Sequence, residues 1–153
     1  MLYVKKENIG KVWPLFADSS KEQNDILRLN HTGTIPVATD LTIANAIDFY
    51  KKIGPERKEA RLRYLQNYWT TRVRGMEHVV RNSPSDPGRS CAIANVGIKG
   101  MKPGDMAKTL LDKYKIYTVA MDSAGVHGCR ITPNVFTTTD ELDALVNALA
   151  DMK

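Results

Sequence analysis

The sequence has 153 residues, of which 42% are hydrophobic and 25% are charged, so its composition is that of a globular protein that can bury one core. No charged and then apolar leader follows Met1, and no apolar run approaches the roughly 18 residues of a membrane span, so we expect a cytoplasmic protein with no membrane partner. The formal net charge of +5 raises the question of nucleic acid binding, which depends on where the charges lie.

The N-terminal part of the chain has little helical or strand periodicity. The segment "MLYVKKE" (1–7) is predicted to be a short strand that needs a sheet to join. Residues 10–30 are mostly irregular, and "NHTGTIP" (30–36) gathers hydrogen-bonding side chains around Gly33. Taken alone, this cluster is typical of a turn in which a glycine adopts a positive φ and the threonine hydroxyls bond the nearby backbone.

Two helices are predicted next. The first is capped by Thr39 or Asp40 and runs to about Ile53, and the second begins near Pro55 with apolar residues spaced three and four apart as far as Val80. Eight basic and two acidic residues lie between positions 51 and 74. We interpret them as a solvated helix face, because no recognition helix, zinc knuckle or aromatic stacking platform accompanies them, and nucleic acid binding is the weaker alternative.

The pattern of the C-terminal half predicts a small α+β module. It follows the turn-rich segment "NSPSDPGRS" (82–90), which is the best candidate boundary in the chain. The predicted elements are a strand over 91–98, a helix over 104–114, strands over 115–121 and 128–136, and a helix that begins with a capping box at Thr138. This order predicts a three-stranded βαββα module with helices on one face of the sheet.

Common catalytic and metal-binding motifs are missing from the sequence. The segment "GIKGMKPG" (97–104) lacks the GxGxxG spacing of a dinucleotide loop, so we interpret it as a loop. Both cysteines lie in apolar, strand-like runs, where a free cysteine behaves as a small hydrophobic residue. Neither they nor the three histidines show metal-ligand or triad spacing, so no metal site is expected (Cys91, Cys129, His31, His78 and His127).

Arg130 is the residue of this module that most needs a partner. It lies between Cys129 and Ile131 in "GCRITPNVF" (128–136), at the mouth of a predicted strand. Its planar guanidinium suits a carboxylate held by two hydrogen bonds. The sequence leaves open whether this carboxylate belongs to a ligand or to an Asp or Glu of the same chain, or whether the arginine simply emerges at the edge of the sheet.

Several segments, in order, resemble class V aminotransferases, which are fold-type I pyridoxal-phosphate enzymes, and most of all their isopenicillin N epimerase-like branch. The segments are "MLYVKKENIGKVWPL", "NHTGTIP", "DLTIANAIDFY", "IGPERKEARLRYL" and "CRITPNVFTTTDELDALVNAL". The resemblance implies an α/β fold that is the C-terminal part of such an enzyme. Residues 1–54 would be the tail of a truncated large domain, residues 55–82 a long linking helix, and residues 83–153 the small α+β domain.

The resemblance also implies roles for three residues. Gly33 and Thr34 would bind the phosphate of pyridoxal 5'-phosphate across a homodimer, and Arg130 would hold the α-carboxylate of an amino-acid substrate. An amide and a hydroxyl near a helix start suit an anion. Epimerisation, transamination or a lyase step would fit the parent enzyme, and the sequence does not choose among them.

The departures from the family pattern concern catalysis. Lys5 and Lys6 do not match the Schiff-base lysine, and no aspartate matches the partner of the cofactor's pyridine nitrogen, so we expect no catalytic residue in this chain and no cofactor binding by it alone. Cys129 abuts Arg130 and does not lie in a preceding loop, which disfavours desulfurase chemistry. A standalone, non-catalytic binding module derived from the small domain is the alternative.

Overall fold

The computed structural model describes residues 3–15, 21–30 and 36–153. The chain forms two compact units, Met1–Asp48 and Phe49–Lys153. The first unit holds two short 3₁₀ helices, η1 (Lys6–Lys11) and η2 (Ile26–Leu29), and most of helix α1 (Val37–Ile53). All the remaining helices and strands belong to the second unit.

The first unit contains few buried contacts among its described residues. Arg28 Nη1 donates to the carbonyl oxygens of Ile9 at 2.9 Å and of Val12 at 3.1 Å, which ties η2 to the end of η1. The strand predicted over residues 1–7 is wrong for the described positions, since residues 3–5 are irregular and η1 begins at Lys6. An extended segment leaves its backbone groups unpaired unless a sheet lies beside it, and a 3₁₀ turn pairs them locally.

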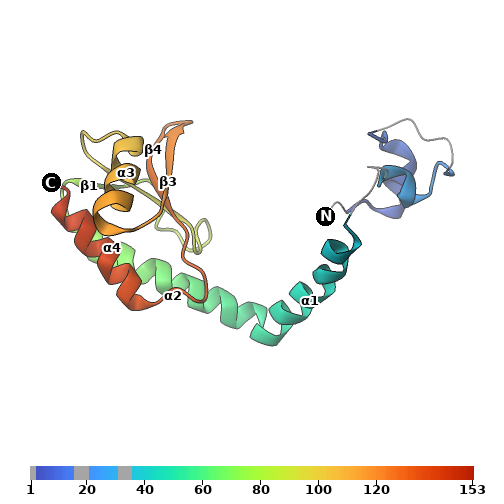
Figure 1. Cartoon of the computed structure of the whole chain (residues 1–153), viewed down its shortest axis with the longest axis horizontal. Coiled ribbons are helices and arrows are strands. Elements are labelled where there is room, and N and C mark those ends of the chain that lie inside the picture. Colours follow the sequence, from blue (N-terminus) through green and yellow to red (C-terminus); the bar gives the residue numbers. More distant parts are fainter. Residues whose placement is uncertain (1–2, 16–20, 31–35) are drawn as a thin grey trace. The chain divides into compact units, whose positions relative to one another are not determined.

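The second unit is a four-stranded antiparallel sheet covered on one face by helices, with α4 lying alongside α2 (Figure 1). The strand order is β1-β2-β4-β3. Its elements are α2 (Pro55–Val73), β1 (Val79–Arg81), β2 (Ala94–Ile98), α3 (Pro103–Tyr114), β3 (Val119–Ser123), β4 (Val126–Ile131) and α4 (Thr139–Asp151). The predicted mixture of helices and sheet is therefore confirmed, with one strand more than the three expected.

The extra strand arises where the helix was predicted to continue. Helix α2 ends at Val73, shortly before Gly75, and residues 79–81 pair with β2 in the register Val79↔Ile98. Glycine has a low helix propensity, and the β-branched Val79 and Val80 favour a strand. The helix therefore ends before Gly75, although the apolar spacing typical of a helix continues to Val80. The two later strands also occupy other positions than expected, because residues 116–118 and 132–136 are irregular.

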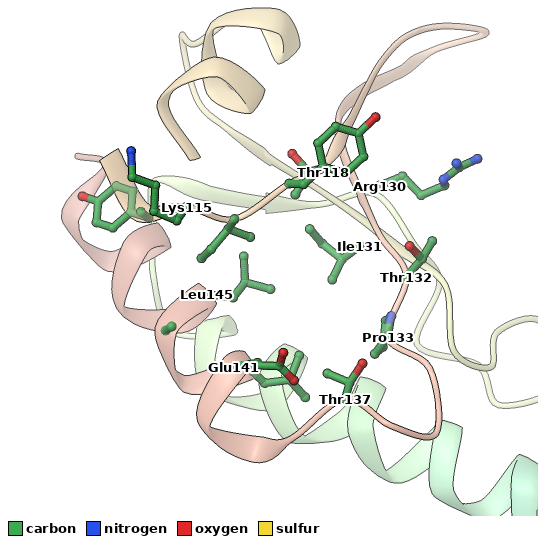
Figure 2. A pocket seen from close by; sticks show the side chains of 14 residues that line it. Lys115, Thr118, Arg130, Ile131, Thr132, Pro133, Thr137, Glu141 and Leu145 are labelled. Carbon is green, nitrogen blue, oxygen red and sulfur yellow. The ribbon is translucent and has the colours of Figure 1, made fainter. Parts of the chain in front are cut away.

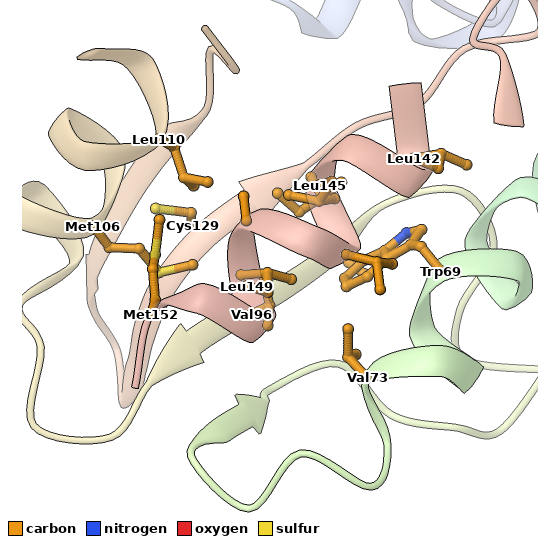
Figure 3. Packing of buried hydrophobic residues seen from close by; sticks show 14 of the residues in the cluster. Trp69, Val73, Val96, Met106, Leu110, Cys129, Leu142, Leu145, Leu149 and Met152 are labelled. Atoms are coloured by element: carbon orange, nitrogen blue, oxygen red, sulfur yellow. The ribbon is translucent and has the colours of Figure 1, made fainter. Parts of the chain in front are cut away.

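The core lies between the sheet and its helices (Figure 3). Trp69 and Leu65 of α2 are fully buried, as are Val96 of β2 and Cys129 of β4. Helix α4 begins with the predicted capping box, in which Thr138 Oγ1 accepts from the Glu141 amide while the Glu141 carboxylate accepts from the Thr138 amide. This packed core holds the sheet rigid, and so fixes the positions of the residues on the sheet face that the helices do not cover.

Candidate functional site

Arg130 lies on the face of the sheet that the helices do not cover. Its strand neighbours Cys129 and Ile131 are buried in the core, and side chains alternate between the two faces of a strand. The Arg130 side chain is therefore exposed, although its strand is central in the sheet. Across the strands it is opposite Asn95 of β2 on one side and Val119 of β3 on the other.

The guanidinium of Arg130 makes no hydrogen bond or ion pair with any residue that the structure describes. Figure 2 shows it pointing away from Leu145 and Glu141. All five N–H groups of the guanidinium are therefore available to an acceptor from outside this set of residues. Because its strand is fixed on both sides by pairing, the stem of this side chain starts from a rigid position.

A second polar group lies next to Arg130 and was not singled out from the sequence. Asn95 is only 7% exposed, and Asn82 Nδ2 donates to its Oδ1 at 2.7 Å. The same Asn82 nitrogen donates to the carbonyl oxygen of His127 at 2.9 Å. A Cβ added to Gly128 would come within 2.6 Å of Asn95 Oδ1, so the absence of a side chain at this glycine makes room for the amide.

A cavity of about 400 Å³ lies where β4 ends and the loop after it begins, on the side of the sheet that the helices cover (Figure 2). Its lining includes Thr118, Ile131, Pro133, Glu141 and Leu145, and Arg130 lies at its rim. Figure 2 shows that the guanidinium of Arg130 points away from Leu145 and Glu141, although the residue itself belongs to the lining of the cavity.

Cys129 has the environment of a core residue. It is fully buried, and its thiol is 3.5 Å from the carbonyl oxygen of Pro103. Burial raises the pKa of the Cys129 thiol above its usual value, so little nucleophilic thiolate forms near neutral pH. Cys91 is half-buried and unpaired. Cys129 therefore does not have the surroundings of an activated nucleophile.

His127 and Asp122 form a second polar pair, at the far end of the β3–β4 hairpin. His127 Nδ1 contacts Asp122 Oδ1, and both side chains are more than half exposed. Among the described residues, no group of three or more His, Cys, Asp or Glu side chains lies in an arrangement that could hold a metal ion. None of the helices in the described ranges is long and apolar enough to span a membrane.

The residues that the sequence assigns to a cofactor are not part of this geometry. Gly33 and Thr34 lie outside the described residues. Every described lysine is exposed except the half-buried Lys58, whose ammonium lies over the ring of Tyr50. A cofactor aldehyde needs a lysine inside an enclosed site, so the described residues alone do not fit pyridoxal phosphate.

Comparison with known proteins places this geometry in a family. The model of the family described as "Aminotransferase class-V" matches residues 1–145. A cysteine desulfurase from Thermococcus onnurineus NA1, solved in its apo form, is similar over 97% of the chain and 41% of its own, with a TM-score of 0.81 and 17% identity.

An alanine–glyoxylate aminotransferase from Nostoc sp. is similar over 89% of the chain and 38% of its own, with a TM-score of 0.64 and 15% identity. At these identities the two structures show the fold alone. The chain spans about two fifths of the length of each. No curated protein sequence matches it.

Proposed function

The chain belongs to the class-V aminotransferase family, and from this premise we propose that it supplies the C-terminal, substrate-binding part of a pyridoxal-phosphate-dependent enzyme that acts on an amino acid. In this proposal Arg130 holds the α-carboxylate of the substrate. No catalytic residue is assigned to the chain.

The observation that carries the proposal is the state of the Arg130 guanidinium. It is exposed, it starts from a paired strand, and it has no partner among the described residues. A guanidinium fork matches the two oxygens of a carboxylate through parallel hydrogen bonds, which fixes the orientation as well as the position of the ligand. Holding the α-carboxylate in this way orients the rest of the amino acid, which is how a binding residue contributes to rate.

The other parts of the proposal concern the larger protein. We assign residues 1–54 to the tail of a large domain, residues 55–82 to a linking segment and residues 83–153 to a small domain. Gly33 and Thr34 would reach the cofactor phosphate of the other subunit in a homodimer. Support comes from the match to the family over residues 1–145 and from the chain's covering only two fifths of the two similar structures.

The described residues do not fit the cofactor by themselves, so the proposal places the cofactor's lysine and pyridine partner outside them. For the same reason the chain alone is proposed to be inactive. Within this family we propose the isopenicillin N epimerase-like branch, which the segments quoted above resemble most, and we assign no reaction among epimerisation, transamination and a lyase step. The buried Cys129 argues against desulfurase chemistry.

A second candidate is a non-catalytic binding module. The observation in its favour is that the second unit has a closed core of its own, built from α2, α3, α4 and the sheet. Such a module would keep the carboxylate-binding arginine without any cofactor. The two candidates share the ligand chemistry at Arg130 and differ in whether a cofactor takes part.

Titration of the full chain with L-alanine and with ethylamine tests the shared claim. Ethylamine has the amino group of alanine and lacks its carboxylate. We expect the NMR signal of the Arg130 Nε–H group to move in a saturable way with L-alanine and to stay in place with ethylamine. Equal responses to both compounds, or no response to either, would overturn the proposal.

A further inference from the structure

We propose that Asn95 is a second carboxylate-binding residue, which donates from Nδ2 to one oxygen of the carboxylate while Arg130 binds the other. The inference rests on the proposed function, since it names a further residue of the same site. It is carried by an observation that Arg130 does not share, namely a buried amide group without an acceptor.

The two residues lie side by side on the uncovered face of the sheet. Asn95 of β2 and Arg130 of β4 are direct cross-strand partners. Directly opposite residues of antiparallel strands have Cβ atoms about 5 Å apart, so their polar ends can reach one small ligand. Asn95 is 7% exposed, so its position is set by the surrounding structure more tightly than that of the exposed arginine.

The orientation of the Asn95 amide follows from its neighbours. The carbonyl oxygen of His127 can only accept, so the Asn82 atom that lies 2.9 Å from it is the amide nitrogen. That nitrogen is 2.7 Å from one side-chain atom of Asn95, which must therefore be the oxygen. Oδ1 of Asn95 is thus occupied, and Nδ2 is on the other branch of the amide.

Nδ2 of Asn95 is buried and has no hydrogen-bond acceptor in the part of the chain that the structure describes. Buried donors in proteins are normally paired, so an unpaired one calls for an explanation. Its neighbour Arg130 cannot supply the acceptor, because a guanidinium only donates. The Asn95 amide nitrogen and the Arg130 guanidinium are therefore adjacent donors that can share one acceptor from a ligand.

A carboxylate matches this arrangement. It is an acceptor with two oxygens, and it carries the charge opposite to that of Arg130. Because Nδ2 is closed to solvent in this structure, a carboxylate reaches it only when neighbouring side chains move. The pair would then distinguish amino acids from amines more sharply than an arginine alone, since loss of the carboxylate leaves a buried donor unpaired.

The test follows the side-chain amide signals of the wild-type chain during titration with L-alanine. We expect the Asn95 Nδ2–H₂ signals and the Arg130 Nε–H signal to move together with one Kd. In Asn95→Leu, which keeps the size and removes the donor, that Kd should rise about 10-fold, as for other lost hydrogen bonds to a charged group. Asn147→Leu, at an exposed asparagine of α4, is the matched control and should leave the Kd unchanged.

The outcomes separate this inference from the proposed function. If Arg130 responds while the Asn95 signals stay in place and Asn95→Leu binds as tightly as wild type, Asn95 is not a ligand and the proposed role of Arg130 survives. If neither residue responds, both fail. Should Asn95→Leu unfold, the wild-type signals still decide, because they require no variant.

Discussion

The hydroxyl of Tyr68 on α2 donates to Asp143 Oδ1 on α4 at 2.9 Å, and so joins the two helices that lie along the sheet. Arg72, one turn further along α2, forms an ion pair with the same carboxylate and lies over the Tyr68 ring, 5.0 Å from its centroid. The Asp143 carboxylate therefore serves two donors of one helix. These are the polar contacts that link α2 and α4 beside their shared core.

The first prediction concerns pH. The hydrogen bond from Tyr68, and then that from Arg72, lower the pKa of Asp143 below its usual value of 3.8. A group with a lowered folded-state pKa stabilises the protein above its unfolded pKa, and this contribution is lost as the pH falls through the folded pKa. Asp143→Asn should therefore lower the urea midpoint near neutral pH and make it less dependent on pH below about 4.

Asp48→Asn is the control for this measurement, because the Asp48 carboxyl is exposed on α1 and has no described partner. It should leave the difference between neutral and acidic midpoints close to that of wild type. Identical pH profiles for wild type and Asp143→Asn would contradict the assigned role of the Asp143 carboxylate.

The second prediction contrasts the two tryptophans. Trp69 is fully buried in the core, and Trp13 is 92% exposed. Trp69→Ala should destabilise the second unit by about 3–5 kcal/mol, because it removes a large buried ring and leaves a cavity. Trp13→Ala should change the free energy of unfolding by less than about 0.5 kcal/mol. Urea unfolding followed by circular dichroism measures both, and similar losses in the two variants would count against the core described here.

The third prediction concerns thiol reactivity. In the folded chain a thiol reagent should modify Cys91 and leave Cys129 unmodified, because Cys129 is fully buried and burial raises its pKa. In Cys91→Ser the native chain should not react, and one thiol should appear on unfolding in urea. Rapid modification of native Cys91→Ser would show that Cys129 is accessible and would reopen the question of a cysteine nucleophile.

The elements with a strong local signal were predictable from the sequence. Helix α4 follows from the capping box at Thr138 and the apolar spacing after it, and α2 follows from Pro55 and its apolar stripe. Strand β1 was not predictable in this way. Its three residues become a strand through pairing with residues 96–98 of β2, which lie 15 to 19 positions further along the chain, and the local pattern contains no sign of that contact.

The site shows the same division between local and long-range information. Arg130 could be singled out because an arginine inside an apolar strand needs a partner. Asn95 has a weaker signal, a single amide in the apolar run "AIANVGI" (92–98), and it was missed. Its importance depends on the register that sets it opposite Arg130 and on Asn82, which fixes its orientation, and both come from folding.

The fourth prediction is that Arg130 contributes little to stability. Its guanidinium has no partner among the described residues, so Arg130→Lys should leave the urea midpoint of the chain unchanged within error. A clear loss of stability would indicate that the guanidinium bonds to another part of the chain, and its role would then be structural.

The affinity of Arg130→Lys for L-alanine tests the central claim most directly. Lysine keeps the positive charge and loses the paired geometry of the fork, so the Kd should rise about 10-fold or more, the effect of 1.4 kcal/mol. Arg89→Lys, at an exposed arginine outside the site, is the matched control and should bind like wild type. An Arg130→Lys chain that folds normally and binds L-alanine as tightly as wild type would contradict the claim that Arg130 holds the carboxylate.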